Sequence, residues 1–302
     1  MQLEINLDIR ESKLSKVKRL FTRKRNLNRS IWGDLGLLIL LAAFGFFSAY
    51  PLIMTASNAF KPLDELFLFP PRLLPRNLTL GNFKDLFELI GNSWVPFSRY
   101  FFNTIFITVL GTAGHVIFAS MCAYPLAKYK FPGKTVLFTL VVYSLMFTPY
   151  VTNIPNYIII TRLGLIDTVW AIVLPAIGSS LGLYLMKQFM EQIPDDLIES
   201  AKIDGASEYR IYWQIVMPLV KPAWVTLIIL LFQRLWTNTG GTFIFSEEKK
   251  PLSYALTLIA QGSIERAGTI AAVSFIMMIV PVTFFIVSQS KVLETFSTSG
   301  MK

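Results

Sequence analysis

The residues of this sequence whose types and spacing could do chemistry gather in one polar segment, residues 191–223, between long apolar stretches. The segment opens with Pro194, Asp195 and Asp196, which is typical of a helix start because carboxylates stabilise the positive end of the helix dipole. Apolar residues at helical spacing follow as far as Gly205, which should break the helix, and a second helical stretch comes after it. A plain connection would not need two helices and a turn, so we expect this docking segment to bind another protein.

Nucleophilic, acid–base and metal chemistry have few candidate residues. The single cysteine, Cys122, excludes an internal disulfide and a cysteine-based zinc site, and we interpret it as a small buried residue. The single histidine, His115, could be a proton relay, but we favour a hydrogen bond to a neighbouring helix. Residues 133–135, Gly-Lys-Thr, resemble the end of a phosphate-binding loop, but Lys128 stands where that loop needs a glycine. We therefore expect no catalytic residue, no metal site and no cofactor in this chain.

Long apolar stretches are the elements that must position the docking segment. The chain has 302 residues, 53% of them apolar and 16% charged, and a mean hydropathy of +0.53, which leaves too little polar surface for a water-exposed globule. We predict an all-α polytopic membrane protein with six transmembrane helices, the docking segment lying between the fourth and the fifth. Five spans lack Asp, Glu, Lys and Arg, and a sixth, from Pro222, is interrupted by Arg234; the five are residues 35–58, 100–127, 135–161, 168–186 and 267–290.

Basic residues give the predicted orientation. Eighteen Lys and Arg lie in the N-terminal segment, the second and fourth connections and the C-terminal tail, whereas nine are spread over the longer loops of the other side. The positive-inside rule therefore places both termini in the cytoplasm. The basic N-terminal segment has almost no interleaved aromatic residues, so we expect no nucleic-acid partner. The predicted parts are a basic cytoplasmic segment (1–30), the first span (31–58), an extracytoplasmic loop with short helical turns over the membrane surface (59–99), a five-helix core (100–290) with the cytoplasmic loop 190–222, and a cytoplasmic tail (291–302).

The spacing inside the docking segment resembles the signature of permease subunits of binding-protein-dependent importers driven by ATP-binding-cassette (ABC) ATPases. That signature reads Glu-Ala-Ala, three residues, Gly, nine residues, then Ile-x-Leu-Pro. This chain keeps both intervals, from Glu199 through Gly205 to Pro218, with Ser200 and Met217 as departures. Similarity to the carbohydrate-uptake branch, which includes the maltose permease, is carried by Asp204, Ala206 and residues 221–223.

The resemblance implies a permease subunit of an ABC importer in the bacterial cell membrane that carries a sugar or oligosaccharide and is not itself an enzyme. It implies four partners: a second homologous permease, two ABC ATPase subunits that bind ATP and Mg²⁺, and an extracellular solute-binding protein. Ala201 and Gly205, four residues apart on one helical face, would let the ATPase backbone approach closely. The residues expected to couple to the ATPase are Glu199, Ser200, Ala201, Asp204, Gly205, Ile215 and Pro218.

Polar residues beside the predicted spans are candidates for a sugar pathway. Arg234, Trp236 and Asn238 would offer polar groups and an aromatic face to a sugar, or Arg234 would instead extend to the outer interface. Asn153 and Asn156 lie where prolines should break the end of the third span, which fits a translocation role or a structural kink. The outer loop 240–268 corresponds by position to the loop that, in the maltose-type family, reaches toward the binding protein.

Two other transport classes stay open as alternatives. A permease of the same superfamily for a non-sugar solute would differ in the flanks of the motif. An ion-coupled secondary transporter would need paired carboxylates within the spans, which carry Asp34, His115 and Arg234 instead. A membrane-embedded enzyme is disfavoured because no span carries a cluster of Asp, Glu and His residues.

Overall fold

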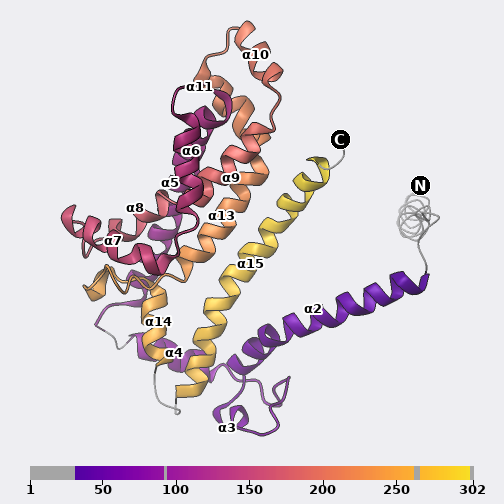
Figure 1. The fold of residues 1–302 in the computed structure, drawn as a ribbon. Helices are drawn as coiled ribbons and strands as arrows, with labels where there is room; N and C mark the ends of the chain where they lie inside the picture. Colours follow the sequence, from indigo (N-terminus) through magenta and orange to yellow (C-terminus); the bar gives the residue numbers. More distant parts are fainter. Residues whose placement is uncertain (1–30, 92–93, 262–265, 300–302) are drawn as a thin grey trace, which may run out of the picture. The chain divides into compact units, whose positions relative to one another are not determined.

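The structure is a computed structural model that describes residues 31–91, 94–261 and 266–299. The described part of the chain consists of helices and their connections and contains no β-strand (Figure 1). It divides into two compact units, Met1–Met54 and Thr55–Lys302, which are described separately.

The first unit contains most of α2 (Ile31–Ala59), a 29-residue helix that continues through Pro51. Its candidate span, Trp32–Ala59, has 28 residues and is therefore about 42 Å long, more than the hydrocarbon thickness of a bilayer. Nothing in its most apolar window is buried within the protein, so side chains such as Phe44 and Phe47 are available to lipid. The first predicted span is confirmed as a helix that is long and apolar enough to cross a membrane.

The second unit is built around α5 (Phe97–Lys128). This helix packs against α8 (Trp170–Ile177), α9 (Ser180–Glu191) and α13 (Lys221–Trp236), and α13 packs in turn against α15 (Ala267–Ser299). The helices α5, α8 with α9, and α15 are each long and apolar enough to span a membrane. They form the framework that positions the loops at either end of the unit.

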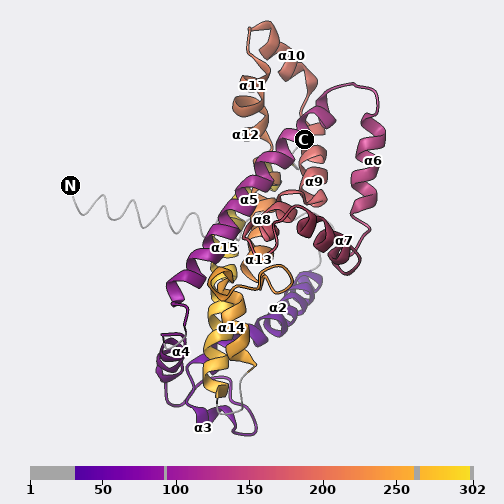
Figure 2. The same cartoon turned by 90° about the vertical axis from the view of Figure 1, so that its left-hand side faces the viewer.

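The two ends of the second unit carry different short helices. Figures 1 and 2 show α10 (Asp195–Ile203) and α11 (Glu208–Ile211) at one end, and α3 (Leu63–Leu66), α4 (Gly81–Gly91) and α14 (Leu252–Ala260) at the other. One cluster of buried apolar side chains lies under α10 and α11, and another joins α4, α14 and the start of α15. A third lies between them, where α5 meets α8 and α13.

The third predicted span, residues 135–161, is two helices, α6 (Lys134–Ser144) and α7 (Pro149–Arg162). Pro149 occupies the first position of α7, where its missing N–H is harmless, and it disfavours helical geometry in the residue before it. With 11 residues, α6 is about 16 Å long and too short to cross a bilayer alone. The sequence predicts a break at the end of this span, and the structure places it near the middle.

The fifth predicted span corresponds to α13, which has 16 residues. It follows α11, a π-helical turn (Tyr212–Val216) and α12 (Met217–Leu219), and these meet α13 at an angle of 74°. Within the described residues, four helical segments have the length and apolarity of a span, and the bent pair is a fifth if it counts as one. A 3₁₀ turn, Glu247–Lys249, completes the elements.

Candidate functional site

The docking segment begins with α10 and turns at Gly205. Its first helix starts at Asp195, as the acidic first turn predicts. Gly205 N donates a hydrogen bond to Lys202 O at 3.0 Å. Ala206 N donates to Ala201 O at 2.9 Å. These two bonds form a Schellman motif, which needs a left-handed residue at Gly205, where φ is +79°.

The helix α10 has a buried face and an exposed face. Ile198 and Ala201, three residues apart, face inward and pack among the apolar side chains under the segment. Ala201 therefore packs within its own subunit, whereas the sequence predicts that it lies with Gly205 on a helical face that the ATPase can approach. The exposed side chains of α10 and its turn include Leu197, Glu199, Ser200, Ile203 and Asp204. Ile203 is 86% exposed, which leaves a large apolar side chain available to a partner.

One stripe of α5 holds the docking segment in place. Ser120, Tyr124 and Lys128 lie four residues apart and therefore on one face of the helix. Ser120 Oγ is 2.5 Å from the hydroxyl oxygen of Tyr212, in the π-helical turn. The Tyr124 hydroxyl donates to Glu208 Oε2, at the start of α11, at 3.2 Å. Lys128 holds the start of α10, so this stripe touches the segment at three separate points.

Lys128, in the last turn of α5, makes two contacts with the start of α10. Its Nζ lies 2.7 Å from Asp195 Oδ1 and also donates to the carbonyl oxygen of Ile193. The ammonium also lies near the negative end of the α5 dipole, which stabilises it there. The hydrogen bond from Lys128 lowers the pKa of Asp195 below its usual value, so this carboxylate is charged at neutral pH.

Glu208 joins α11 to α10 and to the end of α5. Lys202 Nζ lies 2.6 Å from Glu208 Oε1 and 5.4 Å from the centre of the Tyr129 ring. The rings of Tyr124 and Tyr129 meet edge to face, with centroids 5.7 Å apart. The hydrogen bond from Lys202, followed by that from Tyr129, lowers the pKa of Glu208. Sequence reasoning missed these supports, although the spacing of four in Ser120, Tyr124 and Lys128 was a usable signal.

The other predicted coupling residues take two kinds of position. Pro218 is exposed in α12, and Asp204 is exposed beside the Gly205 turn. Ile215 is half-buried against the apolar cluster, as Ala201 is buried within it. Among the described residues, and apart from the two chain neighbours of Gly205, nothing lies within 4 Å of a β-carbon added there. The segment therefore presents an exposed polar ridge around an open turn, supported from inside by apolar residues.

The residues predicted to line a sugar pathway do not form one cluster. Arg234 is exposed, whereas Trp236 is 2% exposed and stacks on a phenylalanine of the same helix. Residues two apart on a helix point to different sides, which separates this pair. Asn238 lies in the turn after α13, where its side-chain oxygen accepts a backbone hydrogen bond. On α7, Asn153 is exposed and Asn156 half-buried; a part for these residues in substrate transfer stays a prediction.

His115 is 1% exposed and lies between α5 and the break that separates α8 from α9. Its Nδ1 is 2.9 Å from the carbonyl oxygen of Ile177, which ends α8. Carbonyl groups in the last turn of a helix have no partner within the helix, so this bond satisfies one of them. A β-carbon at Gly182 would lie 1.8 Å from His115 Nε2, so only glycine fits there. The interpretation of His115 as hydrogen-bonded to a neighbouring helix is confirmed.

Cys122 is exposed on α5, so its interpretation as a buried residue is wrong. The helix turns Met121 and Cys122 outward and Ala123 and Tyr124 toward the core. A small, weakly polar side chain fits a lipid-facing surface as well as a core, so residue type alone could not decide between the two.

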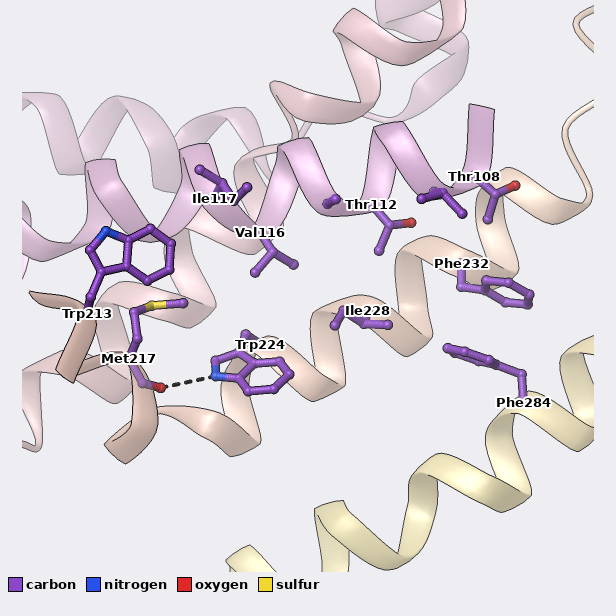
Figure 3. Close-up of a pocket in the computed structure, with 12 residues that line it drawn as sticks. Thr108, Thr112, Val116, Ile117, Trp213, Met217, Trp224, Ile228, Phe232 and Phe284 are labelled. Carbon is purple, nitrogen blue, oxygen red and sulfur yellow. Dashed lines mark hydrogen bonds between the residues drawn. The ribbon is translucent and has the colours of Figure 1, made fainter. Parts of the chain in front are cut away.

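An apolar pocket of about 550 Å³ lies between α5, α13 and α15 (Figure 3). Phe232 and Phe284 stack at one end with ring centroids 4.0 Å apart, and Trp213 and Met217 lie at the other. Its lining contains no charged or amide side chain. A sugar needs several hydrogen-bonding partners, so this pocket suits apolar groups and is not assigned to a sugar.

Asp167 fixes the connection between α13 and α14. Its Oδ1 accepts hydrogen bonds from the backbone N–H groups of Phe245 at 2.9 Å and Ser246 at 2.8 Å. Its Oδ2 accepts from Lys249 Nζ at 3.0 Å and from the Ser246 hydroxyl. That hydroxyl and the other donors hold the pKa of Asp167 well below its usual range. Asp167 therefore holds residues 245, 246 and 249 together, and Tyr100 and Asn103 of α5 bind the residues on either side of Lys249.

Comparison with known proteins gives consistent matches. The family described as binding-protein-dependent transport system inner membrane component matches residues 89–295. The chain is similar to protein LplC of Bacillus subtilis, with 34% identity over 221 residues that cover 72% of each sequence. It is also similar to the galactooligosaccharides transport system permease protein GanQ of Bacillus subtilis, with 29% identity over 273 residues, or 87% of this chain and 94% of GanQ.

A solved structure has a similar fold. It is a bacterial ABC transporter involved in the import of the acidic polysaccharide alginate. The superposition covers 89% of this chain and 99% of one chain of the transporter. It has a TM-score of 0.75 and 23% sequence identity. The likeness supports the helix arrangement described above.

Proposed function

The chain belongs to the family of inner membrane components of binding-protein-dependent transport systems, and from this premise we propose that it is a permease subunit of an ABC importer for sugars or oligosaccharides. The observation that carries the proposal is the docking segment. Its exposed ridge includes Glu199, Ser200 and Asp204, its turn is fixed by the Schellman motif, and its inner side is attached to α5. A separate ATPase that binds this ridge can therefore move α5.

The proposed path of the mechanical signal runs through named contacts. The ATPase pushes on α10 and the Gly205 turn when it closes on ATP. Lys128, Tyr124 and Ser120 pass the displacement to α5, which packs against α8, α9 and α13. The chain itself breaks no bond in this scheme, because ATP and Mg²⁺ are bound by the two ATPase subunits. A second, homologous permease completes the pathway, and an extracellular binding protein delivers the sugar.

The proposed topology has six spans with both termini in the cytoplasm. The broken pair α6 and α7 is the third span, and α13 with its bent inner end is the fifth. Support comes from the sidedness of the basic residues and from the position of α10 at the opposite end of the second unit from α3 and α4 (Figure 2). The docking segment is then cytoplasmic, where an ATPase can reach it.

The substrate class follows from the relatives. GanQ is described as a permease for galactooligosaccharides, and the structural neighbour as an importer of alginate. The exposed Arg234 and Asn153, and the half-buried Asn156 and Asn238, are the chain's proposed contributions to a sugar pathway. Trp236 is too buried to offer its ring face in this arrangement, and it supports the helix that carries Arg234.

The substitution Gly205→Arg tests the docking assignment. An L-residue at φ +79° is strained, and the arginine side chain would project into the space the ATPase must occupy. We expect the variant to insert normally into the membrane but to lose both the co-purifying ATPase and transport. Gly164→Arg is the matched control, since Gly164 has φ +66°, is exposed and has equally open space outside the docking segment. Normal ATPase binding and uptake by the Gly205 variant would contradict the assignment.

A separate experiment tests the substrate. The intact complex, isolated from its native membrane through a tag on this chain and placed in vesicles with its binding protein, should take up oligosaccharides when ATP is inside. Amino acids, polyamines and phosphate form the comparison set. Uptake of one of these in place of any sugar would leave the importer assignment intact and replace its substrate.

A further inference from the structure

The loop after α2, residues 60–80, is folded with two of its charged side chains, Lys61 and Glu65, inside. Lys61 is 2% exposed and Glu65 is 7% exposed. Lys61 Nζ donates to Asn58 Oδ1 at 2.8 Å and to a backbone carbonyl oxygen at 2.6 Å. The Glu65 carboxylate accepts from the backbone N–H groups of residues 76 and 77, at 2.8 and 3.4 Å. Because these hydrogen bonds join distant parts of the loop, its shape is fixed.

The outside of the same loop is apolar. Phe69 is 94% exposed and Leu78 is 78% exposed. Apolar surface left in water costs about 25 cal/mol per Å², so a fixed loop with this surface indicates an apolar neighbour. We call the exposed set the outer rim, and its members are Phe67, Leu68, Phe69, Leu74, Leu78 and Leu80.

The position of the loop identifies that neighbour. Phe60, at the base of the loop, packs against Phe275 of α15 with ring centroids 5.4 Å apart. The candidate span of α15 begins at Ala267, so Phe275, eight residues later, is about 12 Å along it. Leu66 and Phe67 face the first two turns of the same helix across a pocket of about 310 Å³. Phe67, and with it the start of the outer rim, therefore lies beside the first turns of a helix that is long and apolar enough to cross a membrane.

We propose that the outer rim inserts into the interfacial layer of the bilayer, on the side of the membrane opposite α10. There Phe69 and the leucines contact acyl chains just below the headgroups, at the depth of about 5–10 Å that amphipathic elements reach. Arg76, exposed among the rim residues, binds lipid phosphate groups. Trp94, 96% exposed and three residues before α5 begins, lies where an interfacial aromatic residue is expected. The inference goes beyond the proposed function, because it requires only that α15 crosses a membrane.

Depth measurement with spin labels tests this proposal. The single cysteine is replaced in Cys122→Ser, and single labels are then placed at Phe69→Cys, at Leu78→Cys and at the control Lys84→Cys on α4, whose side chain is 79% exposed. The complex, with its co-purifying subunits, is reconstituted in vesicles of phosphatidylethanolamine and phosphatidylglycerol. Accessibility of each label to oxygen, which partitions into lipid, is compared with accessibility to a water-soluble nickel chelate.

The proposal expects oxygen accessibility to exceed nickel accessibility several-fold at residues 69 and 78, and the reverse at residue 84. Two separate rim positions guard against a local disturbance at either one. Nickel accessibility at 69 and 78 equal to that at 84 would place the outer rim in water and overturn the proposal. Labels at 69 and 78 that neither reagent reaches would show that a protein partner covers the outer rim, which also overturns it.

Discussion

The docking segment and the loop 60–80 lie at opposite ends of the second unit and are folded in opposite ways (Figure 2). In the docking segment, apolar Ile198 and Ala201 face inward and polar Glu199 faces outward. In the loop 60–80, charged Lys61 and Glu65 face inward and the apolar outer rim faces outward. The two proposals account for the difference: a protein partner in water would favour the first arrangement, and lipid would favour the second.

The two ends also differ in how their loops are held. The docking segment is attached to α5 through side chains of that helix, so a force on the segment reaches the helix. The outer loops are held by carboxylates that accept backbone N–H groups, Glu65 for residues 76–77 and Asp167 for residues 245–246. Such bonds fix the local shape of each loop. The loop near residue 245 is also bonded to α5, because Tyr100 donates to Glu247 and Asn103 donates to two backbone carbonyl oxygens.

The largest expected effect is that of Glu65→Ala. The change removes a buried acceptor and leaves two partly buried backbone N–H groups without their hydrogen bonds, so we expect a loss of about 1–3 kcal/mol in stability. A thermal unfolding midpoint of the purified complex measures it. Asp64→Ala is the control, because Asp64 is the exposed neighbour of Glu65 and its loss should change little. Equal midpoints for the two variants would remove the basis for the inverted fold of this loop.

The next effect is functional and concerns Lys128→Ala. The variant loses the contacts to Asp195 and to the Ile193 carbonyl oxygen, so the ATPase should still bind but move α5 less effectively. We expect the number of solute molecules carried per ATP to fall at least about fivefold, the lower end of usual coupling effects. The matched control is Lys130→Ala, an exposed neighbour with the same charge. Unchanged transport per ATP in the Lys128 variant would show that force reaches α5 by another route.

The smallest effect is a pH dependence at Asp167. Its pKa is lower in the folded protein than in the unfolded chain, where 3.8 is usual. Its contribution to stability is therefore full above about pH 4 and is lost as the pH falls through the lower, folded pKa. Asp167→Asn should unfold at a lower temperature than the parent protein near neutral pH, and the difference should shrink in strong acid. A difference that stays constant down to strongly acidic pH would show that the charge of Asp167 does not hold the loop.

Much of the fold could be predicted because it depends on local signals. The apolar stretches located α2, α5 and α15, and the pair Pro194-Asp195 with Gly205 located both ends of α10. The sequence predicts the break in the third span near its end, where Pro149 and Pro155 both lie; in the structure the helix breaks before Pro149, and α7 continues through Pro155. The sequence of residues 191–223 predicts two helices with a turn at Gly205, and the structure contains them, but the sequence did not predict that Ala201 faces its own core.

What the sequence could not provide were contacts between distant residues. The attachments of Ser120, Tyr124 and Lys128 connect α5 with residues 65 or more positions away, and no local pattern encodes the partner. The inward turn of Lys61 and Glu65 is equally non-local, since their charges argue for exposure until the backbone groups around them are known. Cys122 shows the reverse error, because a lipid-facing position accepts the residues that a core accepts.

The 74° angle between α11–α12 and α13 has a mechanical consequence. A push directed along α11 and α12 has only a small component along the axis of α13. Most of it acts sideways on the first turn of α13. Pro222, in the first turn of α13, has no backbone N–H and so cannot donate a hydrogen bond that would continue one helix through the bend. In the proposed coupling, motion delivered at the docking segment would therefore reach the start of α13 mainly as a sideways tilt and not as sliding along its axis.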